Sequence, residues 1–188
     1  MRFPRITSLA ILVMSALTVS WLALVMVSPF LVPSGTITDL SGRVGYIDNA
    51  EVISEMDILP RAVYRIGDAQ CHQLADRSYF LNDNQMPFCA RDLGLFVGLA
   101  FASVFALFFR LTINPFLLLI GLVPLGVDGG LQLISSYESV NALRLATGIC
   151  AGGALALLLA QFLLAFKTEE SAPGDAHEVE GDDEPSGK

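Results

Sequence analysis

Four long apolar runs constrain this chain more than any other feature. The first covers residues 6–32 behind a basic N-terminus, and the other three lie between residues 93 and 166. A helix needs about 20 mainly apolar residues to cross the hydrocarbon core of a bilayer. The sequence therefore predicts an all-α integral membrane protein with about four transmembrane helices. A composition of 53% hydrophobic and 16% charged residues points away from a soluble domain, which has about 25% charged residues.

The chain divides into four regions. The predicted regions are an N-terminal signal-anchor span at 1–32, an outer loop at 33–92, a three-span body at 93–166 and a tail at 167–188. The first apolar run is longer than the stretch of about 7–15 residues in a cleaved signal peptide, and no Ala-x-Ala pattern closes it. We therefore expect an uncleaved anchor, with a cleaved signal as the alternative.

The three later spans have recognisable boundaries and interruptions. They are expected at residues 93–109, 116–134 and from 143 or 145 to 166. Pro124 and the Asp128-Gly129-Gly130 segment interrupt the middle span, and the two glycines would let its helix break. In the last span, Gly148 and Gly152 have the spacing that lets membrane helices pack closely.

Basic residues beside the spans set the expected orientation. Four spans place both termini on one side of the membrane, together with Arg2, Arg5, Arg110 and Lys167. Because basic residues near span ends favour the cytoplasm, we expect both termini to be cytoplasmic and the outer loop to lie outside. That loop is expected to contain two helices, at residues 49–56 and 60–73.

The net charge of −8 comes mainly from the tail. Residues 169–188 hold eight acidic residues and one lysine, and they contain no aromatic residue. A segment with so little apolar surface is expected to be disordered, with docking to a basic partner as the alternative. An acidic chain of this kind is not expected to bind nucleic acid.

The outer loop ends in the densest cluster of reactive side chains. The candidate metal ligands are Cys71, His72, Cys89 and Asp92. Thiolate, imidazole and carboxylate groups are all accepted by zinc, which is the expected cofactor of such a site. Outside the cytoplasm, a disulfide between the two cysteines is an alternative. A third interpretation is a thiol made reactive by Arg77 or Arg91.

Ionisable residues near the outer ends of the spans suggest a polar pocket. A charged group within a membrane usually faces the protein interior and has a partner. Asp128 is therefore expected to pair with an arginine, Arg91 or Arg144. The residues expected to converge at this level are Arg77, Arg91, Asp128, Gln132, Asn141 and Arg144.

Two sequence blocks carry a family resemblance. The chain has CHQLADRSYF from Cys71 and CARDLG from Cys89. These blocks resemble the CHQ-x-x-x-RS-(F/Y) and CARC-x-G signature of an uncharacterised family of small polytopic predicted membrane proteins, a domain of unknown function. The resemblance covers residues 58–153. The family pattern implies a Cys3His zinc set, but Asp92 replaces its last cysteine here, so both the metal site and the disulfide stay open.

These features favour a membrane-bound binding or structural module. Its polar pocket would lie on the outer side, held by a metal site or a disulfide. The expected partners are the bilayer, a lipid head group or another membrane protein, and a homo-oligomer is compatible with the pattern. The alternatives are an outer-leaflet metal-dependent enzyme acting on a lipid or small substrate, with Asp128 as the general base, and a small transporter using Asp128. The chain contains no nucleotide-binding loop and no G-x-S-x-G or HExxH motif, which favours the module.

Overall fold

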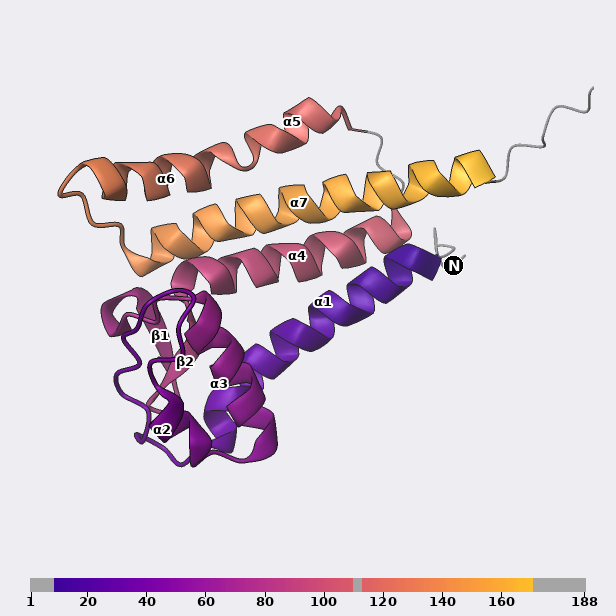
Figure 1. Ribbon diagram of the computed structural model, residues 1–188. Helices are drawn as coiled ribbons and strands as arrows, with labels where there is room; N and C mark the ends of the chain where they lie inside the picture. Colours follow the sequence, from indigo (N-terminus) through magenta and orange to yellow (C-terminus); the bar gives the residue numbers. More distant parts are fainter. Residues whose placement is uncertain (1–8, 110–112, 171–188) are drawn as a thin grey trace, which may run out of the picture.

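Four apolar spans organise the molecule. The computed structural model describes residues 9–109 and 113–170 (Figure 1). Within these residues, the segments long and apolar enough to cross a membrane are Leu9–Leu31, Ala90–Phe108, Pro115–Ile134 and Asn141–Ala165. The prediction of a mainly helical membrane protein with four spans is confirmed. Most of the acidic tail, Arg110 and the two N-terminal arginines lie outside the described residues.

Helices α4 (Ala90–Phe108) and α7 (Asn141–Glu170) lie side by side and form the centre of the bundle (Figure 1). Their glycines allow this approach: a Cβ on Gly148 or Gly152 would overlap the backbone of α4, and one on Gly98 would overlap the backbone of α7. The predicted role of Gly148 and Gly152 in close packing is therefore confirmed. Helix α1 (Leu9–Val27) packs against α4, where Thr18 Oγ1 and Ser103 Oγ are 2.8 Å apart.

The third span is broken just before Pro124, as expected, but not at Gly129 and Gly130. It consists of α5 (Pro115–Ile120) and α6 (Val123–Ile134), which are separated at Gly121 and Leu122 and lie along α7 (Figure 1). Pro124 lies in the first turn of α6, where its missing N–H leaves no hydrogen bond unmade. Helix α6 continues through the Asp128-Gly129-Gly130 segment, so the expected break at these glycines is wrong. Glycine permits a break but does not impose one.

The outer loop forms a small folded unit at one end of the helices (Figure 1). Its elements are α2 (Ala50–Ser54), α3 (Ile58–Gln70), η2 (Ala75–Arg77), β1 (Ser78–Leu81) and β2 (Asn84–Cys89), and η1 (Ser28–Leu31), at the end of the first span, packs against α3 and β2. The two expected helices are present, with α3 ending three residues earlier than predicted. The antiparallel hairpin of β1 and β2 is an addition to the all-α prediction. Its two-residue turn uses Asn82 and Asp83 at φ of 55° and 56°, as expected for such a tight connection.

Buried amides hold the loop together where apolar side chains are scarce. The Asn84 side chain accepts hydrogen bonds from the backbone N–H groups of Thr36 and Ile37, and it donates to the carbonyl oxygens of Pro29 and Pro33. The Gln85 side chain connects other loop segments in the same way. These bonds satisfy irregular backbone that is buried away from water, which would otherwise be destabilising.

Helix α3 and strand β2 are fixed against each other at the end of the loop unit. The Gln73 amide donates a hydrogen bond of 2.7 Å to the carbonyl oxygen of Pro87. A Cβ on Gly67 would overlap the same carbonyl group, so α3 can lie this close to β2 only with glycine at that position. The end of α3 is thereby brought next to the end of β2, where α4 begins.

Candidate functional site

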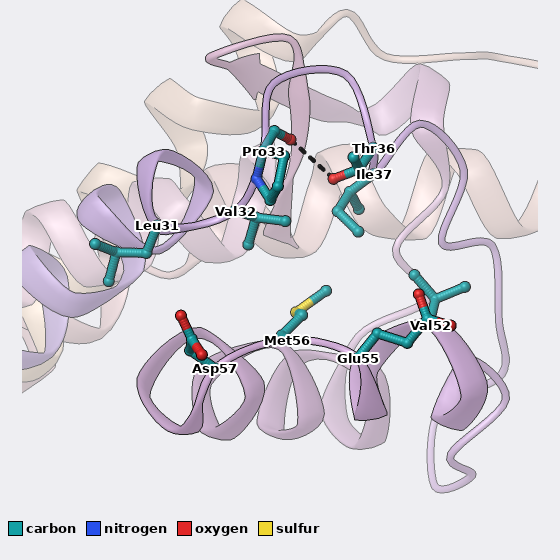
Figure 2. A pocket seen from close by; sticks show the side chains of 9 residues that line it. All are labelled: Leu31, Val32, Pro33, Thr36, Ile37, Val52, Glu55, Met56 and Asp57. Atoms are coloured by element: carbon teal, nitrogen blue, oxygen red, sulfur yellow. Dashed lines mark hydrogen bonds between the residues drawn. The ribbon is translucent and has the colours of Figure 1, made fainter.

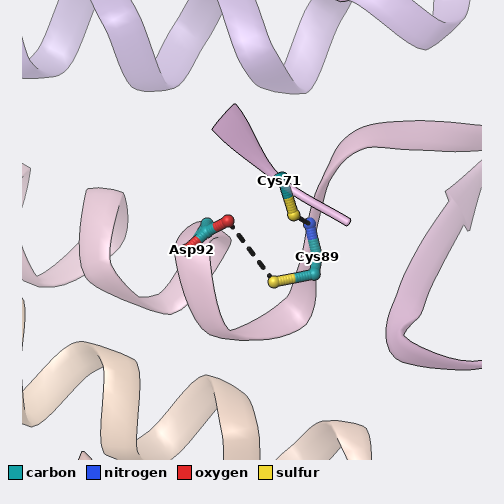
Figure 3. Close-up of side chains that lie close together, drawn as sticks. All are labelled: Cys71, Cys89 and Asp92. Carbon is teal, nitrogen blue, oxygen red and sulfur yellow. Dashed lines mark hydrogen bonds between the residues drawn. The ribbon is translucent and has the colours of Figure 1, made fainter. Parts of the chain in front are cut away.

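Three potential metal ligands gather at the junction of α3, β2 and α4. Cys71 directly follows α3, Cys89 directly precedes α4, and Asp92 lies in the first turn of α4. The two sulfur atoms and one carboxylate oxygen all lie within 4.8 Å of one another (Figure 3). Cys89 Sγ lies 3.4 Å from Asp92 Oδ2, and the Cys89 N–H lies 3.4 Å from Cys71 Sγ. We call these three residues the Cys-Cys-Asp group.

The fourth predicted ligand, His72, is not part of this group. The backbone at Cys71 is extended, with φ of −129° and ψ of 150°. Successive side chains of extended backbone point in opposite directions, so a buried Cys71 is followed by an exposed His72. Because they are neighbours in extended backbone, the side chains of Cys71 and His72 point to opposite sides and do not meet at one metal ion.

Both thiols of the group are free, and the disulfide considered from the sequence is not formed. The Cys71 thiol donates to the Cys89 sulfur, which lowers the pKa of Cys89. The same hydrogen bond, together with burial, raises the pKa of Cys71. The main influence on the Cys89 thiol is thus its cysteine neighbour and not the charge of Arg77 or Arg91.

A cavity of about 70 Å³ borders the Cys-Cys-Asp group. We call it the arginine cavity, and its walls are Cys71, His72, Leu74, Arg77, Cys89, Arg91, Gln132 and Arg144. The three arginines come from three elements: Arg77 from η2, Arg91 from α4, which follows η2 after the β1–β2 hairpin, and Arg144 from the distant α7. Four of the six residues predicted to share a polar pocket line this cavity, and the other two contact its walls.

Asp128 is one of those two residues, and it is paired with Arg91 as expected. Arg91 Nη2 donates to Asp128 Oδ2 at 2.6 Å, and Gln132 Nε2 lies 3.3 Å from the same oxygen. The Asp128 side chain is only 4% exposed. The ion pair joins α6 to α4 at the cavity wall. Among the described residues, no acidic side chain lines the cavity itself.

Asn141 is the other residue, and it joins α7 to the outer loop. Its Nδ2 lies 3.2 Å from the carbonyl oxygen of Asp76 and 3.3 Å from that of Ser78. Its Oδ1 accepts a hydrogen bond of 3.0 Å from Arg144 Nη1. Asn141 thus orients a buried guanidinium and holds the loop segment that carries Arg77.

The cavity-lining guanidinium groups have unused hydrogen-bond donors. Within the described part of the chain, the buried Nε atoms of Arg77, Arg91 and Arg144 have no hydrogen-bond acceptor. Arg144 is 4% exposed, so water does not freely replace the missing acceptor. Buried donors without partners are rare, and they are explained where a ligand supplies the acceptor.

A second cavity, of about 330 Å³, lies in the outer loop between η1 and α2 (Figure 2). Glu55 and Asp57 contribute carboxylates to its wall, and Met56 contributes an apolar surface. None of the residues singled out from the sequence lines it. The sequence gives little indication of this cavity, because its walls are mainly backbone turns and aliphatic side chains of common types.

Comparison with known proteins places the site within a family. The sequence pattern of the predicted membrane proteins DUF2085 matches residues 71–158. An uncharacterised protein of Methanocaldococcus jannaschii is 36% identical over 96 residues, which are 48% of this chain and 61% of that protein. An uncharacterised protein of Methanothermobacter thermautotrophicus is 31% identical over 91 residues, which are 47% of this chain and 82% of that protein. The chain belongs to the DUF2085 family. No solved structure matches it.

The DUF2085 match contains the whole candidate site. It begins at Cys71 and includes every residue of the Cys-Cys-Asp group, every residue of the arginine cavity, Asp128 and Asn141. Helix α1 and most of the outer loop lie outside the match. The chain spans 61% of the length of the first relative and most of the second.

Proposed function

We propose that this DUF2085 protein is a membrane module whose arginine cavity binds the phosphate of a lipid head group. The observation that carries the proposal is the convergence of three guanidinium groups on one cavity that no acidic side chain lines. Arginine is suited to this role because its planar donors match the oxygens of a phosphate group.

The electrostatics of the cavity favour an anion. Arg144 is buried beside two other cations, and each of them repels it. Asp128 is bonded to Arg91, and Asp76 Oδ2 lies 3.7 Å from Arg77 Nε. These two carboxylates compensate two of the three positive charges and leave that of Arg144. The cost of burying the remaining charge falls when an anion binds, and the unused Nε–H donors gain acceptors at the same time.

The size of the cavity restricts the ligand. Pockets for whole drug-sized ligands have volumes of about 300–1,000 Å³. At about 70 Å³ the arginine cavity accommodates one small group, such as a phosphate, and not a complete lipid. The rest of a bound lipid would therefore extend out of the cavity.

The position of the cavity along the spans favours a lipid as the source of that phosphate. Its walls include the first turns of α4 and α7 and the last turns of α6, which are the ends of three membrane spans. Lipid phosphates lie at this level of a bilayer. With both termini in the cytoplasm, as the positive-inside rule predicts, the cavity faces the outer leaflet.

Native mass spectrometry in a phosphate-free maltoside detergent tests the proposal. The probes are short-chain phosphatidylglycerol, diacylglycerol with the same chains, and inorganic phosphate. We expect phosphatidylglycerol to bind and diacylglycerol not to bind. Arg77→Gln and Arg144→Gln should each weaken binding at least about tenfold, because a hydrogen bond to a charged group contributes about 1.5–3 kcal/mol.

Arg65→Gln is the matched control, because Arg65 is an exposed arginine of α3 outside the arginine cavity. It should bind phosphatidylglycerol as the unmodified protein does. Equal binding of diacylglycerol, or equal losses in Arg65→Gln and Arg77→Gln, would overturn the proposal. Tight binding of inorganic phosphate with no binding of phosphatidylglycerol would contradict the lipid as its source.

A further inference from the structure

We propose that Cys71, Cys89 and Asp92 bind one zinc-like divalent metal ion with three protein ligands and an open fourth position. The proposal concerns the Cys-Cys-Asp group alone and does not depend on phosphate binding in the arginine cavity. It differs from the four-ligand structural site that the sequence suggests, because His72 is excluded from the group.

The spacing of the three ligand atoms fits a tetrahedral ion. Metal–sulfur bonds of about 2.3 Å and metal–oxygen bonds of about 2.0–2.2 Å give a sulfur-to-oxygen edge of about 3.5 Å in a tetrahedron. The distance from Cys89 Sγ to Asp92 Oδ2 is 3.4 Å. The third atom, Cys71 Sγ, lies within 4.8 Å of both, so small side-chain movements complete the face of a tetrahedron (Figure 3).

The same spacing favours a metal over a disulfide. A disulfide requires the sulfur atoms to be about 2.05 Å apart, whereas two thiolates on one zinc ion lie about 3.8 Å apart. The two thiols are free in the structure. A metal ion therefore needs smaller side-chain movements than a disulfide, for which the two sulfur atoms would have to approach to bonding distance.

The surroundings of the group stabilise anionic ligands. Cys89 is the residue before α4 and Asp92 lies in its first turn, so both face the positive end of that helix. The backbone N–H of Cys89 points to Cys71 Sγ, as second partners of metal thiolates do. On its other side, Cys71 packs among Val63, Met86 and Phe88, which fix its position.

An open coordination position follows from the ligand count. Closed structural zinc sites have four protein ligands, whereas sites with three keep a position for water or another small ligand. Cys71 and Cys89 also line the arginine cavity, so the fourth position is reached from that side. On metal binding, both thiols lose their protons to the buffer.

Titration of the purified, reduced protein with Co²⁺ in phosphate-free buffer tests the site, because Co²⁺ reports tetrahedral thiolate ligation in its absorption spectrum. We expect one ion per chain. Cys71→Ser and Cys89→Ser should abolish the thiolate bands, and Asp92→Asn should weaken binding at least about tenfold. Cys150→Ser is the control, because Cys150 is an exposed cysteine of α7 outside the group.

His72→Ala and added azide test the open position. We expect His72→Ala to retain the Co²⁺ spectrum and azide to change it. Loss of the ion in His72→Ala would show that His72 is a fourth ligand, and no response to azide would show that the ion has no accessible open position. Either result would overturn this inference. Absence of stoichiometric metal in the unmodified protein would overturn it as well. Helicity measured by circular dichroism identifies variants that fail to fold. If the two cysteine variants fail to fold, the affinity of Asp92→Asn for Co²⁺ is compared with that of the unmodified protein instead.

Counting the reactive thiols distinguishes a Cys71–Cys89 disulfide from the proposed metal site. Unfolded, metal-free protein purified without reductant should show three reactive thiols. A single thiol, from Cys150, would mean that Cys71 and Cys89 are joined, and it would contradict the metal site. Neither result changes the outcome of the phosphatidylglycerol measurement, which is made without added metal, so the two proposals fail separately.

Discussion

Arg91 and Asp128 form an ion pair of 2.6 Å that joins the first turn of α4 to the middle of α6. Its carboxylate is buried and its guanidinium is about one quarter exposed. The pair is one of the few polar connections between the third span and the rest of the bundle in the described residues. Removing one partner leaves the other charge buried without compensation.

Asp128→Ala and Arg91→Ala should therefore each destabilise the protein, by about 3 kcal/mol, which is the lower end for a buried pair because Arg91 is partly exposed. The double variant should recover part of the loss. Thermal unfolding in detergent measures this as a double-mutant cycle. Strict additivity of the two single effects would show that the pair contributes no coupling energy.

Gly152→Ala should destabilise the bundle by about 1–3 kcal/mol, because the new methyl group would overlap the backbone of α4 at Leu95. Gly126→Ala provides the control, since a Cβ there meets nothing within 4 Å. It should be neutral or slightly stabilising, as expected for alanine in a helix. Chemical unfolding followed by circular dichroism compares them, and equal effects would contradict the close packing of α4 and α7.

Asn84→Ala should loosen the outer loop without disturbing the spans. The side chain has both donors and acceptors bonded to buried backbone, and its removal leaves several of these groups unsatisfied at about 1–3 kcal/mol each. Limited proteolysis should then cleave within residues 33–49 faster than in the unmodified protein. Asn82→Gly serves as a comparison, because Asn82 is exposed, donates two longer hydrogen bonds and has a positive φ that glycine accepts without strain. Unchanged cleavage in Asn84→Ala would contradict the proposed role of this residue.

The orientation of the spans is open to direct measurement. A cysteine at exposed Glu51, in α2, should react in intact cells with a reagent that does not cross membranes. A cysteine at exposed Asn114, between α4 and α5, should react only after lysis. The reverse pattern would place both termini outside.

The sequence predicts the spans well because membrane insertion depends on the length and apolarity of a continuous segment. It also identifies Asp128 as needing a partner, since an isolated acid within a span is destabilising. It predicts the hairpin less well. Asn82 and Asp83 are suited to a tight turn, but Pro87 argues against a strand at the position that it occupies in β2.

Other features depend on contacts between distant segments. The exclusion of His72 results from the extended backbone at Cys71, which is set by the way α3 ends. The buried amides of Gln73, Asn84 and Gln85 satisfy backbone groups from remote parts of the loop, and no local pattern distinguishes them from surface amides. For these residues, side-chain type alone gives no indication of burial.

The glycine contacts between α4 and α7 also determine the spacing of two positive charges. A Cβ on Gly148 would overlap the backbone of Arg91, and one on Gly94 would overlap the backbone of Leu145, the residue after Arg144. Helix packing therefore holds these two guanidinium groups at a fixed separation, against their mutual repulsion. The cavity is thereby preorganised for the anion that we propose, because the free energy needed to bring like charges together is supplied when the helices pack and not by the ligand.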